Sequence, residues 1–385
     1  MKEKYIAIAK ENEAQLIADR RYLHENPEFS MELPGTVAYV RKRLESMGYQ
    51  VSDCGGGLTC TAGSGGPVIL LRADMDALKV TEDNDLPFKS TNGFAHVCGH
   101  DTHTAMLLGA AKILKEMETQ LRGRVKFMFQ PAEETIIGAK AMTEDGILEN
   151  PKVDAALAMH VMPHITNGEF HYKREMCFSY MDIFTIEVRG VGGHGSMPDK
   201  CVDPIFSVVQ IYNMLNGIVA RQSSMFDSAV LTVGALNGGS MPNVIPDTAK
   251  LEGTLRCYDG EIRDRIMAEI EQIADAVCTA TGTTFTYSTR STKGIYNNPD
   301  FCDAVLPFVE EIIEDKVIED KLPNNASEDF SLISHEVPSM FMLMGVGEEG
   351  APGLHDPKAI FREEKLYLGS AVLSYAAAKW LESKN

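Results

Sequence analysis

Residues 96–103, HVCGHDTH, gather one cysteine, three histidines and one aspartate into eight positions. Cys98 in this stretch could act as a nucleophile beside a histidine, as a redox thiol or as a metal ligand, because a thiolate can serve in all three. The stretch alone leaves the three interpretations open, so the rest of the chain has to separate them.

Four other short segments carry side chains that can bind metals, and each ends a predicted strand or lies in a loop. They are RADMDAL (72–78), QPAEE (130–134), LAMH (157–160) and GLHDP (353–357). A single histidine or glutamate pair in such a place is most often structural or simply solvated. In an open parallel sheet, however, ligands bind beyond the carboxyl ends of the strands. We therefore expect all these segments to converge on one site.

The carboxylates in these segments favour a metal centre. Asp74 and Asp76 stand two residues apart, so on a strand both would point to the same side. Glu133 and Glu134 follow the apolar run FMF, and Pro131 prevents the strand from simply continuing. Buried carboxylates are costly without a cation nearby. A pair of divalent metal ions would meet this need and activate a water molecule, with one unligated carboxylate left as the base.

Two other classes of function remain open from the residues alone. The first is a thiol hydrolase that uses Cys98 with His100, although residues at i and i+2 rarely face each other usefully. The second is a non-catalytic binding module, which would have lost acidic or metal-binding residues that this chain keeps.

Strand and helix patterns alternate through most of the chain. The residues predict helices over 5–23, 34–47 and 101–118, and strands over 67–78, 124–130 and 154–160. The first of these strands opens with a continuous apolar run and turns acidic, as expected of a buried central strand that delivers side chains to a site. The alternation predicts an α/β fold, a mostly parallel sheet with helices on both faces.

The pattern changes near residue 180. The stretch MDIFTIEVRG places Asp182 and every second residue to Val188 on one face, which predicts an antiparallel strand with one covered face. The βαββαβ order that follows predicts a smaller α+β domain, a ferredoxin-like open-faced sandwich, inserted into the larger one. We therefore expect a discontinuous domain of residues 1–180 and 293–385 and an inserted domain of residues 181–292.

Composition excludes several classes of function. The 385 residues exceed one ordinary core, and with 44% hydrophobic and 24% charged residues they indicate a globular protein of two domains. A formal net charge of −19 argues against nucleic acid as a partner, and no apolar run is long enough to cross a membrane. The charged, amphipathic start of the chain has no signal-peptide core and the eight cysteines are scattered, so we expect a cytoplasmic protein with mostly free thiols.

Nearly the whole chain resembles the two-metal amidohydrolases, a family that includes hippurate hydrolases, N-acyl-amino-acid aminoacylases, N-acetyldiaminopimelate deacetylases and plant indoleacetyl-amino-acid hydrolases. The matching motifs are RRYLHENPEFSMEL, LRADMDAL, HVCGHDTHTAMLLGAA, FQPAEE, GVGGHGSMPDKCVDPI, GGSMPNVIPDTAKLEGTLR, SEDFS and GLHDPKAIF. The resemblance implies hydrolysis of the amide bond of an N-acyl amino acid, with two divalent metal ions, zinc or manganese, as cofactors. A dipeptidase or carboxypeptidase of the same family is the alternative.

The resemblance also implies a role for each polar residue of the site. The implied metal ligands are Cys98, His100, Glu134, His160 and His355. Glu133 resembles the general base that activates water and then passes the proton to the leaving amine. One aspartate of the DMD stretch resembles the residue that orients a ligand, and the choice between Asp74 and Asp76 stays open.

Three residues of the inserted domain resemble substrate contacts. His194 resembles a histidine that reaches the site of a neighbouring subunit and stabilises the oxyanion. Asn243 and Arg256 resemble residues that hold the free carboxylate of the substrate, and arginine suits this role through two parallel hydrogen bonds. The resemblance therefore implies a homodimer formed through residues 181–292, a lid and dimerisation domain, while the discontinuous domain binds the metals.

Overall fold

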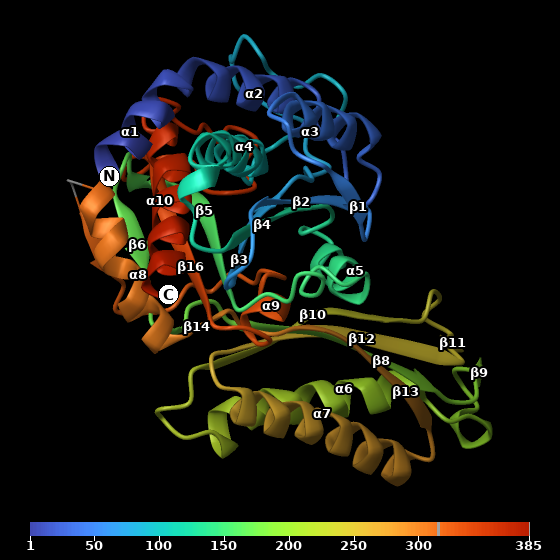
Figure 1. Cartoon of the computed structure of the whole chain (residues 1–385). Helices are drawn as coiled ribbons and strands as arrows, with labels where there is room; N and C mark the ends of the chain where they lie inside the picture. The colour runs from blue at the N-terminus through green and yellow to red at the C-terminus, as the bar shows by residue number, and fades with distance from the viewer. Residues whose placement is uncertain (314–315, 385) are drawn as a thin grey trace. The chain divides into compact units, whose positions relative to one another are not determined.

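The computed structural model describes residues 1–313 and 316–384, which form two compact units (Figure 1). The first unit contains Met1–Cys177, Ile295–Leu322 and Glu328–Asn385. The second unit contains Phe178–Gly294 together with Pro323–Ser327. The first unit is therefore discontinuous in sequence, and a short late segment returns to the second unit.

A large sheet forms the centre of the first unit. Among the described residues it has eight strands, in the order β1 (Ser52–Cys54), β2 (Gly57–Gly63), β4 (Arg124–Gln130), β3 (Val68–Asp74), β5 (Ala155–Thr166), β16 (Ser339–Gly347), β6 (Phe170–Tyr172) and β15 (Val317–Glu319). The central strands β4, β3, β5 and β16 are parallel to one another, whereas β1–β2, β2–β4 and β16–β6 are antiparallel pairs. The predicted α/β fold with a mostly parallel sheet is confirmed.

β3 is the buried central strand that the sequence predicts, but it is shorter than expected. All of its residues are buried, and it ends at Asp74 rather than at residue 78. Beyond that point Ala77 and Leu78 leave the sheet and form isolated backbone bridges to other segments. Asp76 therefore lies beyond the end of the strand, and the argument that placed Asp74 and Asp76 on one strand face is wrong.

Helices surround this sheet. Their bounds are α1 (Lys2–Glu11), α2 (Glu13–Glu25), α3 (Pro34–Ser46), α4 (His100–Glu116), α5 (Gly138–Glu144), α8 (Pro299–Ile312), α9 (Ser331–Ser334) and α10 (Leu366–Ser383). The single helix expected over residues 5–23 is thus divided at Asn12. Its two parts, α1 and α2, pack on α4 and α10 rather than on the strands of the sheet. None of the helices formed by the described residues is long and apolar enough to cross a membrane.

The packing of α4 fixes the helix whose first residue is His100. α4 is buried along nearly its whole length. It lies beside α10, and the two approach closely because Gly109 has no side chain: a Cβ there would lie 2.3 Å from Oγ of Ser370. The Ser370 hydroxyl instead donates a hydrogen bond to the carbonyl of Met106 at 2.8 Å. The middle of α4 is therefore held closely against α10.

The second unit has the βαββαβ order that the sequence predicts. Its elements are β8 (Tyr180–Arg189), α6 (Pro204–Gly217), β10 (Ala229–Gly238), β12 (Thr248–Cys257), α7 (Gly260–Thr281) and β13 (Thr284–Thr292). The sheet order is β10-β12-β8-β13, and every neighbouring pair is antiparallel. The ferredoxin-like sandwich is confirmed. Two short ribbons complete the described strands: β9 (Gly193–His194) with β11 (Val244–Ile245) in this unit, and β7 (Glu175–Met176) with β14 (Tyr296–Asn297) in the first.

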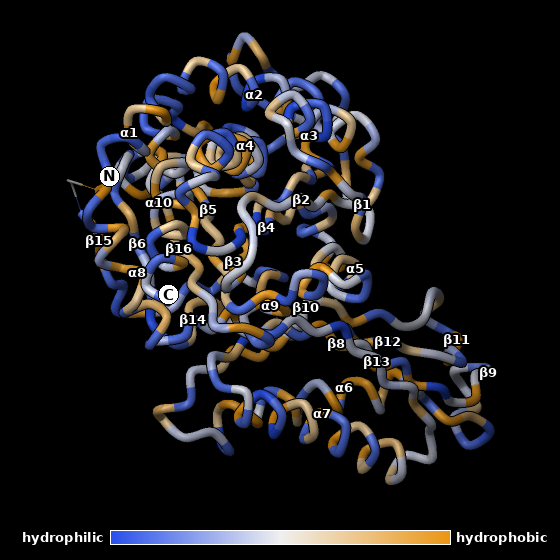
Figure 2. The backbone as a smooth tube through the Cα atoms, in the orientation of Figure 1, coloured by the Kyte–Doolittle hydropathy of each residue, from blue (hydrophilic) through white to orange (hydrophobic). Residues whose placement is uncertain are grey.

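The covered face of β8 is the one that the alternation predicts. Phe184, Ile186 and Val188 are fully buried in the core beneath α6 and α7, and the residues between them are partly exposed. Figure 2 shows the matching pattern on α7, where apolar and hydrophilic residues alternate along the helix. Asp182 is buried at the same face because its carboxylate pairs with the guanidinium of Arg263.

Candidate metal centre

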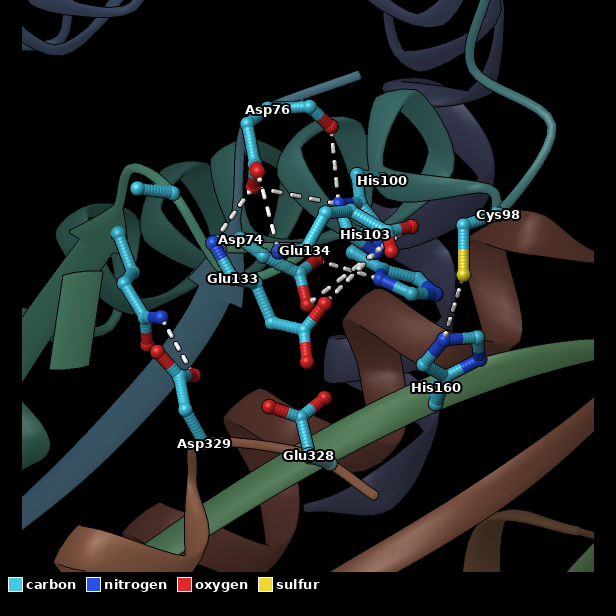
Figure 3. A network of polar contacts seen from close by, with 12 residues as sticks. Asp74, Asp76, Cys98, His100, His103, Glu133, Glu134, His160, Glu328 and Asp329 are labelled. Atoms are coloured by element: carbon cyan, nitrogen blue, oxygen red, sulfur yellow. Dashed lines mark hydrogen bonds and ion pairs between the residues drawn. The ribbon is translucent and has the colours of Figure 1, made fainter. Parts of the chain in front are cut away.

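The five polar segments meet within the first unit, as Figure 3 shows for most of their residues. β3 and β4 deliver their polar side chains at or beyond their ends. β5 does not end at residue 160 as expected but continues to Thr166, so His160 points into the cluster from the middle of that strand. The residues that the structure brings together are Asp74, Asp76, Cys98, His100, Glu133, Glu134, His160 and His355. All sequence-predicted site residues of the first unit therefore lie in one cluster.

The turn from Cys98 to His100 depends on the glycine between them. Gly99 adopts φ +91, and a Cβ there would lie 2.5 Å from a side-chain methyl of Val161 on β5. Because only glycine takes this conformation without strain and without that clash, the chain can place Cys98 against β5 and start α4 at the next residue. Cys98 and His100 consequently face the same polar cluster, although they stand only two residues apart.

Cys98 faces His160 across a short distance. The Cys98 Sγ lies 3.5 Å from Nε2 of His160, whose Nδ1 donates a hydrogen bond to the Val161 carbonyl at 2.7 Å. Burial, reinforced by the carboxylates of Glu134 and Glu133, raises the pKa of the Cys98 thiol well above its usual value. Burial also holds the pKa of His160 well below its usual value. The protein alone therefore gives a neutral thiol beside a neutral imidazole, which is unlike the thiolate–imidazolium pair of a thiol hydrolase.

His100 presents an unsatisfied nitrogen to the centre of the cluster. Its Nδ1 lies 2.9 Å from the backbone carbonyl of Asp76 and donates to it. Its buried Nε2 has no hydrogen-bond partner, and the nearest oxygens belong to Asp74 at 3.7 Å and to Glu133 and Glu134 at 3.9 Å. Those separations exceed a hydrogen bond but suit ligand atoms spaced around a common ion. The orphaned nitrogen therefore fits a metal ligand.

Two sets of donor atoms share Cys98. In each set the donor atoms lie within 4.8 Å of one another: Cys98 with His100 and His160, and Cys98 with Glu134 and His355. His355 is placed in its set by a left-handed backbone, φ +67, which is uncommon for a residue with a side chain. Its Nε2 lies 3.3 Å from Oε1 of Glu134. Thiolate, imidazole and carboxylate together suit zinc or a similar divalent ion, and the shared sulfur suits a bridged pair.

Asp76 and Asp74 have different partners. The carboxylate of Asp76 accepts hydrogen bonds from the backbone N–H groups of Glu133 at 2.9 Å and Glu134 at 3.1 Å. The carboxylate of Asp74 instead accepts from Nη1 of Arg72 at 2.7 Å and from Nδ1 of His103 at 2.6 Å. Burial works against the charge of Asp74, but Arg72 outweighs it and holds the pKa of that carboxyl well below its usual value. Asp76 thus contacts the glutamate turn directly, whereas Asp74 belongs to a buried charge cluster.

Glu133 lies in a tight backbone turn, and its buried carboxyl group has other carboxylates nearby. Ala132 and Ile136, on either side of the glutamate pair, adopt left-handed conformations of φ +55 and +58. Burial raises the pKa of the Glu133 carboxyl well above its usual value, and the carboxylates of Glu328 and Glu134 raise it further. A carboxyl that holds a proton more readily than usual suits a group that takes a proton and returns it.

Sequence reasoning missed Glu328 and Asp329, whose motif SEDFS carried no assigned role. Both lie beside Glu133 in Figure 3 and bind the buried guanidinium of Arg72, Glu328 at 2.8 and 3.2 Å and Asp329 at 3.2 Å. The signal that could have found them is Arg72 itself, because an arginine inside a buried apolar strand requires carboxylate partners. His103 supports the site: its Nε2 accepts from the Val161 N–H and its Nδ1 donates to the Asp74 carboxylate.

In the second unit, His194 lies on the β9–β11 ribbon and Asn243 immediately precedes β11. The Gly195 N–H donates to the Asn243 carbonyl at 2.9 Å, beside the backbone pair of His194 with Val244. The exposed His194 ring accepts at Nδ1 from the backbone N–H of Ser196 at 3.1 Å. With Nδ1 accepting, Nε2 is the ring nitrogen that can donate.

Arg256 lies elsewhere in the same unit. It stands near the end of β12, whereas Asn243 precedes the ribbon that leads into the start of that strand. Eight residues of strand separate Arg256 from Thr248, roughly 26 Å at 3.3 Å per residue. Arg256 lines a cavity of about 550 Å³ with Tyr258 and Asn325. Its buried Nη1 has no hydrogen-bond partner, and burial lowers the pKa of the guanidinium. The structure therefore does not bring Asn243 and Arg256 of one chain together.

The chain is similar to known proteins over nearly its whole length. It matches peptidase family M20/M25/M40 over residues 70–379. It is 36% identical over 381 residues to an N-acetyl-L-cysteine deacetylase of Bacillus subtilis, covering 96% of this chain and 89% of that protein. It is 34% identical over 393 residues to thermostable carboxypeptidase 2 of Saccharolobus solfataricus, covering 98% of each. A solved structure of the Bacillus subtilis YXEP protein, a dinuclear metal-binding peptidase from the M20 family, is similar with a TM-score of 0.83 at 30% identity, over 97% of this chain and 99% of that one.

These similarities span both units and reach beyond single motifs. They agree with the cluster of metal-binding side chains around Cys98 and with the resemblance seen in the sequence motifs, which they confirm. The chain belongs to peptidase family M20/M25/M40.

Proposed function

We propose that this protein is a metal-dependent hydrolase that cleaves the amide bond between an acyl group and an amino acid. The observation that carries the proposal is the pair of donor sets sharing Cys98, with the carboxyl of Glu133 beside them. The similarity to an N-acetyl-L-cysteine deacetylase supports an N-acyl amino acid as the substrate class.

The residues that would hold two divalent ions are Cys98, His100, Glu134, His160 and His355. The thiolate favours zinc, whereas manganese would draw mainly on the carboxylate and imidazole ligands. When bound, such a pair of ions polarises the amide carbonyl and lowers the pKa of a water molecule. Binding of the ions also explains how the buried Cys98, whose pKa the protein alone raises, would lose its proton.

Glu133 is the general base in this proposal. Its carboxylate takes a proton from the attacking water as the new carbon–oxygen bond forms. It then gives that proton to the amine nitrogen as the carbon–nitrogen bond breaks, so the products are a carboxylate and a free amino acid. Asp76 keeps Glu133 in place, because its carboxylate holds the backbone of the glutamate turn through two hydrogen bonds.

We propose a homodimer in which a second copy completes the site. His194 would donate from Nε2 to the developing oxyanion, and Asn243 and Arg256 would bind the free carboxylate of the substrate. Because Asn243 and Arg256 of one chain lie far apart, one carboxylate can contact both only if they come from different copies.

The second unit also offers a surface for the second copy. β10 lies at the end of its sheet order among the described strands, and unpaired edge strands tend to pair with other chains. Large apolar side chains are exposed nearby, with Phe206 on α6 55% exposed and Val230 on β10 61% exposed. A twofold pairing of β10 edges would cover both features.

A carboxypeptidase or dipeptidase is the second candidate function. The similarity to a thermostable carboxypeptidase favours it, and the unpaired Arg256 suits a peptide C-terminus as well as an acylated amino acid. We also propose a reducing compartment, such as the cytoplasm, because all eight cysteines are unpaired.

The test is the release of amine from N-acetyl, N-benzoyl and indoleacetyl amino acids and from dipeptides, with and without chelator and with added zinc or manganese. Chelator-sensitive release from one acylated class supports the proposed function and identifies the acyl group. Release from dipeptides alone favours the second candidate. No release from any substrate by metal-loaded protein would overturn both.

A further inference from the structure

A connecting loop, residues 79–94, joins two of the segments that form the metal centre. It begins three residues after Asp76 and ends just before the stretch that holds Cys98. The neck of the loop is closed by two backbone hydrogen bonds between Leu78 and Ala95, at 3.1 and 3.0 Å. The position of the loop therefore bears on both segments at once.

The connecting loop also reaches the segment of His355. The backbone N–H of Asp83 donates to the carbonyl of Pro357 at 2.8 Å, and the N–H of His355 donates to the carbonyl of Val97 at 2.9 Å. Three chain segments that supply the site are thus joined by main-chain hydrogen bonds, with the loop as one of the joining pieces. A displaced loop would shift the ligand set.

Glu82 organises the loop from inside. Its side chain is fully buried, and its carboxylate accepts from the backbone N–H of Ser90 at 2.8 Å and from the side-chain amide of Asn84 at 2.7 Å. A buried carboxylate needs a cation as well as hydrogen bonds. That cation comes from outside the loop.

The cation is His24, near the end of α2. Its Nε2 lies 2.7 Å from Oε1 of Glu82, and its Nδ1 lies 2.9 Å from Oδ2 of Asp101 in the first turn of α4. A neutral imidazole could donate at only one nitrogen, so two short contacts with carboxylates require a ring protonated at both. Arg20 pairs with the same oxygen of Asp101 at 2.8 Å and approaches Nδ1 of His24 only at 3.4 Å. His24 consequently links α2, α4 and the connecting loop.

We propose that His24 is a positioning residue, which acts through Glu82 and Asp101 to hold the connecting loop and the first turn of α4 in the arrangement that the metal ligands require. The inference rests on the proposed metal-dependent hydrolysis. An aromatic contact reinforces the same link. The ring of Phe88, in the loop, packs edge-on against the ring of His24, with their centroids 5.4 Å apart. The Cζ atom of Arg20 lies 4.8 Å from the centroid of the Phe88 ring.

The test uses the full-length, metal-loaded protein and the variants His24→Gln and Glu82→Gln. Trypsin reports on the loop, because Lys79 and Lys89 lie within it. We expect each variant to be cleaved at these lysines at least about tenfold faster than wild type. Manganese(II) titrated into metal-free protein should bind about tenfold more weakly, and kcat/KM should fall about tenfold or more, as loss of residues supporting a metal site typically does.

The control is Glu25→Gln, an exposed change beside His24, which should match wild type in all three measurements. The double variant His24→Gln/Glu82→Gln should be no worse than the worse single variant, because both changes break one link. Unchanged cleavage at Lys79 and Lys89, or unchanged manganese affinity, would overturn the proposal even if the melting temperature fell. If His24→Gln does not fold, Glu82→Gln decides alone. The proteolysis and the titration need no substrate, so they stand even if the proposed hydrolysis fails.

Discussion

The carboxylate of Asp76 accepts a hydrogen bond from the backbone N–H of Glu133 at 2.9 Å, although the two residues follow different strands. A second bond from Glu134 makes the contact bidentate. Asp76 therefore fixes the main chain of the residue that we propose as the base and of its metal-binding neighbour. This relationship separates Asp76 from Asp74, which the sequence alone did not do.

We predict that Asp76→Asn and Asp74→Asn fail in different ways. Asparagine keeps one acceptor oxygen, so Asp76→Asn loses one backbone bond, and a displaced Glu133 should lower kcat by about 100-fold. Asp74→Asn instead weakens a buried ion pair with Arg72, which should lower the free energy of unfolding by about 3 kcal/mol or more. Denaturant unfolding and steady-state kinetics of both variants make the comparison. An active Asp76→Asn beside a stable but inactive Asp74→Asn would reverse the assignment.

We predict that Glu133→Ala keeps the fold and the metals but loses at least about two orders of magnitude in kcat, as removal of a general base typically does. Glu133 is not in either donor set that contains Cys98, so metal content measured by elemental analysis should match wild type. The matched control is Glu144→Ala, a surface glutamate on α5, which should retain full activity. Near-normal turnover by Glu133→Ala would exclude it as the base.

The sequence predicted which polar residues gather in one cluster better than it predicted the residues that support them. Cys98, His100 and Glu134 stand in short motifs whose residue types favour a metal centre and which resemble those of a known family, and this information is local. The partners of Arg72 are not local: Glu328 follows it by 256 positions, and no periodicity indicates that the two meet. The buried position of Arg72 implies that carboxylates lie beside it, but the sequence does not indicate which carboxylates they are.

Backbone geometry accounts for other differences. The expected strand over residues 67–78 ends at Asp74 because Ala77 and Leu78 pair with Phe29 and Ala95, and such isolated bridges leave no pattern in the sequence. In the second unit, the order of elements was predictable from alternation, whereas the distance between Asn243 and Arg256 depends on which end of β12 each one adjoins. The fold class can therefore be predicted from the periodicity of apolar residues. The arrangement of the site also depends on where each strand ends and on which residues of neighbouring segments pair.

We predict that Arg256→Met weakens the binding of substrates that carry a free carboxylate and leaves the binding of other substrates unchanged. Its guanidinium faces a cavity and has an unsatisfied nitrogen, so the change breaks no hydrogen bond at Nη1. A charge-assisted contact of about 1.5–3 kcal/mol corresponds to a loss of about 10- to 100-fold, expected mainly as a higher KM. The same acyl amino acid with its carboxylate amidated should be hydrolysed equally by wild type and variant. Equal losses on both substrates would refute the contact, and the exposed Arg290→Met is the control.

The charge on His24 makes stability depend on pH. Burial is the largest influence and lowers the pKa of His24, and the positive charge of Arg20 also lowers it. The carboxylates of Asp101 and Glu82 together have the larger effect, so the pKa of His24 is raised above its usual value. The ring centroid of His96 lies 6.4 Å from that of His24. Burial lowers the pKa of His96 to about 3, so this neighbouring ring stays neutral. The stabilisation is therefore fully present below the unfolded pKa of about 6.5 and is lost as pH rises through the higher folded pKa.

We accordingly predict that the difference in unfolding free energy between wild type and His24→Gln is largest near pH 6 and shrinks toward alkaline pH. Urea unfolding at a series of pH values between about 6 and 9 measures it, with Glu25→Gln as the reference variant. A difference that stays constant or grows with pH would show that His24 is not held as a cation.

The last prediction concerns the second copy. His194 lies on the β9–β11 ribbon and Asn243 immediately precedes β11, whereas Arg256 stands near the far end of β12. A site that uses all three residues therefore takes them from two chains. Mixing His194→Ala with Glu133→Ala, each inactive alone, should then restore activity. One site of each mixed dimer would hold an intact Glu133 together with an intact His194 from its partner, so at full exchange about a quarter of wild-type activity is expected from random pairing. Subunit exchange is followed with a tagged copy. Exchange without recovered activity would place His194 in the site of its own chain.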